Sequence, residues 1–121
     1  MESILIVDDD VDLCTVLSEE LAAVGYDTYF LTDGEKVLSY VLNNNVDLIL
    51  LDLKMNGKDG FDVLRELENA GINLPIIVLT AYADVQSAIE SAKMGAKDFL
   101  SKPYDFDELL ITLRRTLQRD V

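Results

Sequence analysis

Five side chains suited to polar chemistry follow short apolar runs in this sequence. They are Asp8, Asp9, Asp52, Thr80 and Lys102. If the carboxylates met, two like charges about 4 Å apart would repel by roughly 4 kcal/mol at an effective dielectric of about 20. Three carboxylates beside one ammonium leave a net charge of minus two, which a divalent cation neutralises. All-oxygen ligands favour Mg²⁺ over softer metals, so the sequence predicts Mg²⁺ as the cofactor.

The same residues supply the parts of a phosphoryl-transfer site. Such a site needs an in-line nucleophile, a cation that spreads charge off the phosphoryl oxygens, and donors aimed at those oxygens. Asp52 is the predicted nucleophile, and Asp8, Asp9 and Asp52 are the predicted Mg²⁺ ligands. The Lys102 ammonium and the Thr80 hydroxyl would contact the phosphoryl oxygens. We therefore expect Asp52 to become an acyl phosphate.

Taken singly, each residue has a plainer explanation. Asp9 or Asp10 can cap the first helix, and Asp52 can simply end a strand. Thr80 can begin a turn, and Lys102 can be solvated. Only their joint occurrence at strand ends favours the chemical interpretation.

Two patterns of apolar residues predict the strands and helices that must position these side chains. Apolar runs without polar alternation are typical of strands covered on both faces of a parallel sheet. Between them, apolar residues recur at helical spacing. The predicted strands cover residues 4–7, 27–31, 48–51, 76–79 and 99–100. The helical apolar positions are Leu13, Leu17, Leu21 and Val24; Val37, Leu38, Val41 and Leu42; Phe61, Leu64 and Leu67; Val85, Ala88, Ile89 and Ala92; and Phe106, Leu109, Leu110, Leu113 and Leu117.

Helix-end signals agree with this division. Gly25, Gly71 and Gly95 fall just after periodic segments, where a left-handed cap favours glycine. Asp84 and Asp105 stand at predicted helix starts. The alternation predicts an α/β fold, a single doubly wound (βα)5 domain over residues 1–121 with helices on both faces. Its parallel strands end at one edge, where such sheets bind ligands, so the five polar side chains should converge there.

Composition excludes several functional classes. The chain has 23 acidic and 10 basic residues and a formal charge of −13, which would repel nucleic acid. It contains no histidine, which removes imidazole catalysis and the usual zinc sites. Charges interrupt every apolar stretch well before the roughly 20 residues that cross a bilayer, and no leader pattern is present, so we expect a cytoplasmic protein. Cys14, the single cysteine, is predicted to be a buried helix residue rather than a redox site.

These motifs together resemble the receiver domain of two-component response regulators, including the chemotaxis regulators. Asp8-Asp9 matches the acidic pair of that family, Asp52 its phosphoacceptor, Thr80 its switch hydroxyl and Lys102-Pro103 its lysine-proline step. The resemblance extends over essentially the whole chain. It implies a flavodoxin-like parallel sheet of strand order 2-1-3-4-5.

The resemblance also assigns roles to individual positions. It implies that Lys54 gives its backbone carbonyl to the metal and that the Lys102-Pro103 bond is cis, which X-Pro tolerates at small cost. Phe99, three residues before Lys102, matches the switch aromatic, whose ring turns inward as Thr80 moves toward the phosphoryl group. Lys54 and Tyr82 would flank the path of an attacking water and tune the lifetime of the acyl phosphate.

The implied partners follow from the same family. A sensor histidine kinase would donate the phosphoryl group from a phosphohistidine, and the domain would catalyse its own phosphorylation and dephosphorylation without being an enzyme on other substrates. Phosphorylation would remodel the surface of residues 85–113, which would then contact an output domain, a downstream regulator or a second copy in a homodimer. Control of transcription is one expected output, and the output type stays open. The cognate kinase, the signal and the presence of a longer chain stay open.

One segment departs from the family pattern. Receivers commonly carry proline after the methionine of the acceptor loop, whereas Met55 is followed here by Asn56 and Gly57. Without the fixed φ of proline, the loop should cost more to order and be more mobile.

Three other functions share parts of this pattern. An aspartyl-phosphate hydrolase would need Thr or Val where Asp12 stands, and room for a substrate cap. A flavodoxin-like electron carrier has the same architecture, but Asp8, Asp9 and Asp10 would repel its anionic phosphate. The third alternative is a receiver that serves only as a docking module, and the intact chemical set argues against it.

Overall fold

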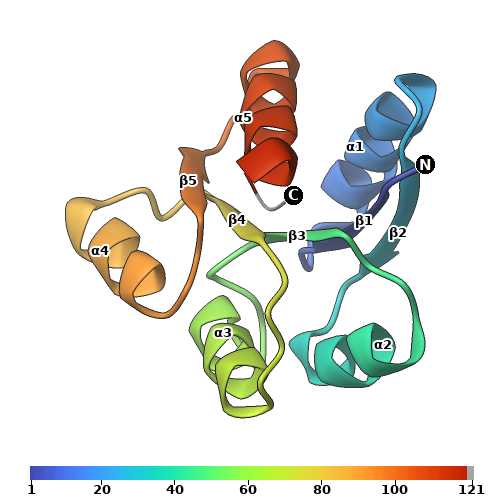
Figure 1. Ribbon diagram of the computed structural model, residues 1–121. Coiled ribbons are helices and arrows are strands. Elements are labelled where there is room, and N and C mark those ends of the chain that lie inside the picture. The colour runs from blue at the N-terminus through green and yellow to red at the C-terminus, as the bar shows by residue number, and fades with distance from the viewer. Residues whose placement is uncertain (120–121) are drawn as a thin grey trace.

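The computed structural model describes residues 1–119 and confirms a doubly wound α/β fold. Five parallel strands lie in the order β2-β1-β3-β4-β5, with helices on both faces of the sheet (Figure 1). The strands are β1 (Ser3–Val7), β2 (Asp27–Leu31), β3 (Leu48–Leu51), β4 (Ile76–Thr80) and β5 (Asp98–Ser101). The helices are α1 (Val11–Ala23), α2 (Val37–Asn43), α3 (Gly60–Asn69), α4 (Val85–Lys93) and α5 (Phe106–Arg119), with a short 3₁₀ helix η1 (Gly34–Lys36) before α2.

The central strands are buried on both faces, as their uninterrupted apolar runs predict. In β1, Ile4 and Ile6 join a core cluster with α1 and α5, whereas Leu5 and Val7 join a second cluster with α2 and α3. Figure 1 shows α1 and α5 together on one side of the sheet, and α2 and α3 on the other. Successive side chains of a strand point to opposite faces, so two covered faces require apolar residues at every position. The edge strand β5 is only half-buried.

The predicted helix ends are confirmed. Asp10 caps α1 by accepting the Leu13 N–H at 3.1 Å, and Asp84 caps α4 by accepting the Ser87 N–H at 2.7 Å. Three glycines after helices have positive φ, where other residues are strained. They are Gly25, Gly71 and Gly95, with φ of 102°, 72° and 104°. The Asp59 cap of α3 was not predicted.

Some of the apolar positions that mark the predicted helices are not buried. Val24 and Leu42 are exposed, and on α4 Val85 and Ile89 expose 75% and 45% of their surface. Helical periodicity marks an apolar face but does not say that a neighbour covers it. Helix α5 buries the periodic residues Leu109, Leu113 and Leu117, and it buries Thr112 and Thr116 as well. Thr116 donates its hydroxyl hydrogen to the Thr112 carbonyl at 2.8 Å.

The strand ends carry the predicted polar residues to one edge of the sheet. The Asp52 N–H donates to the Val7 carbonyl at 2.9 Å, which joins the end of β3 to the end of β1. The Lys102 N–H donates to the Thr80 carbonyl at 2.9 Å, which joins the ends of β5 and β4. These backbone bonds place the site residues where the ladders finish. No helix within residues 1–119 is long and apolar enough to cross a membrane.

Candidate functional site

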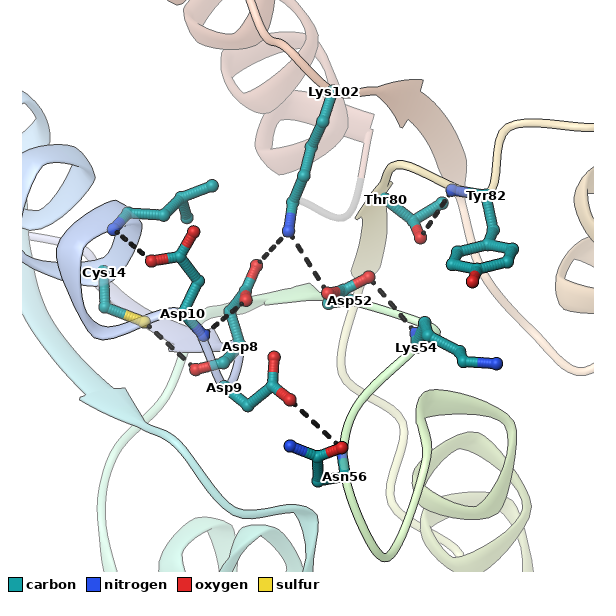
Figure 2. Close-up of polar contacts among 11 residues, drawn as sticks. Asp8, Asp9, Asp10, Cys14, Asp52, Lys54, Asn56, Thr80, Tyr82 and Lys102 are labelled. Atoms are coloured by element: carbon teal, nitrogen blue, oxygen red, sulfur yellow. Dashed lines mark hydrogen bonds and ion pairs between the residues drawn. The ribbon is translucent and has the colours of Figure 1, made fainter.

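Three carboxylates from two strand ends meet at this edge. One oxygen from each of Asp8, Asp9 and Asp52 lies within 4.8 Å of the others. Asp8 and Asp52 are buried, and Asp9 is half-buried. Figure 2 shows them beside the Lys102 ammonium. The structure therefore brings together four of the five side chains on which the sequence prediction depends.

Lys102 joins the two buried carboxylates. Its Nζ lies 2.6 Å from Asp8 Oδ2 and 3.2 Å from Asp52 Oδ2. Burial alone would lower the pKa of Lys102, but its hydrogen bonds and charge interactions with Asp8 and Asp52 outweigh burial and raise that pKa. Lys102 is therefore a firmly charged ammonium at the centre of the cluster.

Local turns orient the two buried carboxylates. The Asp10 N–H donates to Asp8 Oδ1 at 3.0 Å, and the Lys54 N–H donates to Asp52 Oδ1 at 3.2 Å. In both cases the donor lies two residues after the aspartate, which is the hydrogen bond of an Asx turn. The sequence analysis missed these donors, although an aspartate at a strand end signals such a turn.

The third carboxylate takes its hydrogen bond from a different part of the chain. The Asn56 N–H, in the loop between β3 and α3, donates to Asp9 Oδ2 at 3.0 Å. Sequence reasoning assigned no partner to Asn56, because a contact across 47 positions leaves no local signal.

The charge balance of the cluster fits a hard divalent cation. Burial raises the pKa of Asp8, and the hydrogen bonds from Lys102 and Asp10 offset this only in part. A carboxyl group whose ionised form is unfavourable gains from a nearby cation. The donors are carboxylate oxygens gathered within 4.8 Å, which is the ligand type that Mg²⁺ prefers.

Thr80 and Tyr82 lie on the far side of Asp52 from Asp8 and Asp9 (Figure 2). Thr80 is fully buried, and its Oγ1 accepts the Tyr82 N–H at 3.1 Å. The Lys54 ammonium lies 4.9 Å from the centroid of the Tyr82 ring, within cation–π range. Lys54 and Tyr82 thus contact each other next to the phosphoacceptor candidate.

Phe99, on β5, is part of the core. It is half-buried and packs against the core cluster on the α2 and α3 side of the sheet, with Val78 as its neighbour on β4. The Lys102-Pro103 peptide bond is cis, as the family resemblance implies.

Two further residues, Gly60 and Cys14, support the site. The sequence analysis did not assign this role to either of them. A Cβ at Gly60 would lie 2.3 Å from the Asp52 carbonyl oxygen, so only glycine fits where α3 begins. Cys14 is buried, as predicted, and its Sγ donates to the Asp8 carbonyl at 3.3 Å. Burial, helped by the negative charge of Asp8, raises the pKa of Cys14 to about 12, so the thiol keeps the proton that it donates.

Comparisons with known sequences identify the family of this chain. A family model described as the response regulator receiver domain matches residues 4–114. The chain is 40% identical over 114 residues to the transcriptional regulatory protein ZraR of Escherichia coli (strain K12), which covers 94% of this chain and 26% of ZraR. It is 39% identical over 116 residues to the response regulator MprA of Mycobacterium sp. (strain KMS), which covers 96% of this chain and 50% of MprA. The chain thus spans between 26% and 50% of the length of these curated relatives.

Solved structures of response regulators are also similar to this chain. The receiver domain of Francisella response regulator 1452 has a TM-score of 0.93 and 32% identity, with 100% of both chains covered. The response regulator TrrA of Thermotoga maritima, solved in complex with Mg²⁺-BeF, has a TM-score of 0.85 and 34% identity, with 96% of this chain and 99% of TrrA covered. This chain therefore belongs to the response regulator receiver domain family of two-component systems.

Proposed function

We propose that this receiver domain accepts a phosphoryl group on the carboxylate of Asp52 from a phosphohistidine of a sensor histidine kinase. The observation that carries the proposal is the meeting of Asp8, Asp9, Asp52 and Lys102 at the carboxyl edge of the sheet. The relative TrrA, solved with Mg²⁺-BeF, supports a metal-dependent reaction. Family membership gives no support to the hydrolase and electron-carrier alternatives.

Asp52 would act as the nucleophile. One of its oxygens attacks phosphorus while the phosphorus–nitrogen bond to the donor histidine breaks, so the imidazole leaves with the bonding electron pair. The Lys102 ammonium, whose Nζ lies 3.2 Å from Asp52 Oδ2, would contact the oxygens of the phosphoryl group once it is attached to Asp52. The side chains of Asp8, Asp9 and Asp52 and the backbone carbonyl of Lys54 would hold Mg²⁺, which neutralises charge on the transferring group when bound.

The acyl phosphate would then change a distant surface. Its added charge would attract the Thr80 hydroxyl, whose hydrogen remains available because Oγ1 accepts from Tyr82. Movement of Thr80 would open space toward which the half-buried Phe99 ring turns. The surface of residues 85–113 would follow and alter its contact with an output domain, a downstream regulator or a second copy of this chain.

We further propose that residues 1–121 form one receiver unit that works in the cytoplasm and catalyses its own phosphorylation and dephosphorylation. The curated relative ZraR is a transcriptional regulatory protein of greater length, which supports control of transcription as the output. The charge of −13 supports an indirect role, in which this domain itself does not contact DNA.

Phosphorylation by acetyl phosphate, with and without Mg²⁺, tests the proposal by intact mass. We expect one phosphoryl group on the wild type in the presence of Mg²⁺ and none on Asp52→Asn. The matched control is Asp12→Asn, at an exposed position in the first turn of α1, which should be modified like the wild type. An adduct that persists on Asp52→Asn would show that another residue is the nucleophile.

A further inference from the structure

The loop between β3 and α3 reaches across to the acidic pair. The Asn56 backbone N–H donates to Asp9 Oδ2 at 3.0 Å, although the two residues are 47 positions apart. Figure 2 shows the second Asp9 oxygen on the side of Asp8 and Asp52, away from Asn56. One Asp9 oxygen therefore accepts a hydrogen bond from the loop, while the other lies toward Asp8 and Asp52.

The loop is anchored on both sides of Asn56. Before it, Met55 is buried in the core cluster with α2 and α3. After it, Lys58 forms an ion pair of 2.6 Å with Glu66 on α3, and its side chain is largely covered. These contacts anchor the loop on both sides of Asn56 and hold its amide against Asp9, although no proline follows Met55.

Asp9 depends on this donor more than its neighbours depend on theirs. Asp8 and Asp52 are buried, contact Lys102 and accept an N–H from a residue two positions later. Asp9 is only half-buried, and its hydrogen bond comes from outside its own turn. The orientation of Asp9 therefore depends on the β3–α3 loop.

We propose that the Asn56 backbone N–H is a positioning group for the cation site, which holds Asp9 with one oxygen so that the other can bind Mg²⁺. The inference builds on the proposed function and adds a residue that acts through its backbone. Binding linkage is reciprocal: if the hydrogen bond favours the metal-binding orientation, bound Mg²⁺ must strengthen the hydrogen bond by the same factor. If Asp9 instead had to leave the amide to reach the metal, both effects would reverse sign.

Two substitutions at one position separate backbone from side chain. Proline has no N–H, so Asn56→Pro removes the donor, whereas the conservative Asn56→Ala keeps it. The fixed φ of proline lowers the cost of ordering the loop, which would favour binding, so weaker binding by Asn56→Pro is due to the lost N–H. Calorimetric titration of the full chain with MgCl₂ should show about three- to tenfold weaker binding for Asn56→Pro and wild-type affinity for Asn56→Ala. Thermal unfolding in chelator establishes that both variants are folded before titration.

Amide hydrogen exchange of the wild-type protein keeps the test independent of any variant. Mg²⁺ should slow exchange of the Asn56 amide several-fold more than that of the neighbouring Gly57 amide. Equal Mg²⁺ affinity of Asn56→Pro and Asn56→Ala, or faster Asn56 exchange with Mg²⁺, would overturn the inference while leaving the proposed function intact. A wild-type chain that binds no Mg²⁺ would overturn both.

Discussion

Helices α3 and α4 follow neighbouring strands but are attached to the molecule very differently. Helix α3 begins eight residues after Asp52 and buries Gly60, Val63, Leu64 and Leu67. Helix α4 begins five residues after Thr80, and of its nine residues only Ser91 is buried. Its apolar residues Val85 and Ile89 face solvent.

This difference separates Asp52, the proposed phosphoacceptor, from helix α4, the element that would respond to its phosphorylation. Regions with few buried apolar contacts open at lower free energy than the core, and switching elements are drawn from such regions. The Asp52 carboxylate stands on the well-packed side, where geometry must be held. The Thr80 side leads into the weakly packed helix, where a small change in contacts can shift the position of an entire element.

The largest expected effect comes from truncating the packed face of α3. Leu64→Ala should lower the free energy of unfolding by about 2–5 kcal/mol, because removing most of the buried leucine side chain leaves a cavity in the core. The equivalent truncation Ile89→Ala on α4 should cost less than about 0.5 kcal/mol. Urea unfolding of both variants measures the contrast, and similar losses would mean that α4 is packed as firmly as α3.

The first residues of the two helices provide a second contrast. Gly60→Ala should cost about 1–3 kcal/mol, because a methyl group must displace the Asp52 carbonyl and the Leu53 backbone. It should also slow phosphorylation of Asp52. Val85→Ala, at the exposed start of α4, should leave both properties close to the wild type. Unfolding and acetyl phosphate kinetics test this pair, and a fully active, stable Gly60→Ala would contradict the close packing at α3.

Asp8, in the acidic cluster with Asp52, and Asp84, at the start of α4, should respond to pH with opposite signs. Burial raises the pKa of Asp8, so its contribution to stability is present below its unfolded pKa of 3.8 and is lost as pH rises through the higher folded pKa. At neutral pH and without Mg²⁺, Asp8→Asn should therefore stabilise the fold.

Asp84 at the start of α4 shows the reverse behaviour. Its hydrogen bonds from Ser87 lower its pKa, so its contribution is present above the unfolded pKa and is lost as pH falls. Asp84→Asn should therefore not gain stability at neutral pH. Unfolding at a series of pH values in chelator measures both variants, and a destabilised Asp8→Asn would show that the Lys102 contacts outweigh burial.

The smallest expected effect concerns the contact that joins the two sides. Lys54 follows β3, Tyr82 follows β4, and the ammonium lies 4.9 Å from the ring centroid. An exposed cation–π pair contributes about 0.5–1 kcal/mol. A double-mutant cycle with Lys54→Ala and Tyr82→Ala should give a coupling near the lower end of this range, and Tyr82→Phe should preserve it. If the two single substitutions lower stability additively, Lys54 and Tyr82 do not stabilise each other.

The sequence predicted the fold from patterns that are local. Uninterrupted apolar strands such as 76–79, glycines such as Gly25 and aspartates such as Asp84 each report on their own neighbourhood. Those signals sufficed to place five βα units in order and to bring Asp8, Asp9, Asp52 and Lys102 to one edge. They did not reveal that Val85 and Ile89 face solvent, because periodicity records an apolar face and not its neighbour.

By itself the sequence determined the element order, the shared edge and the identity of the side chains that gather there, since each depends on hydrophobic period or on residues at strand ends. Only the tertiary structure decided that Lys102 joins Asp8 to Asp52 and that the Asn56 amide holds Asp9. Such contacts depend on strand register and on the path of a loop backbone. Neither is encoded in a local window, because an N–H donor is present at every residue except proline.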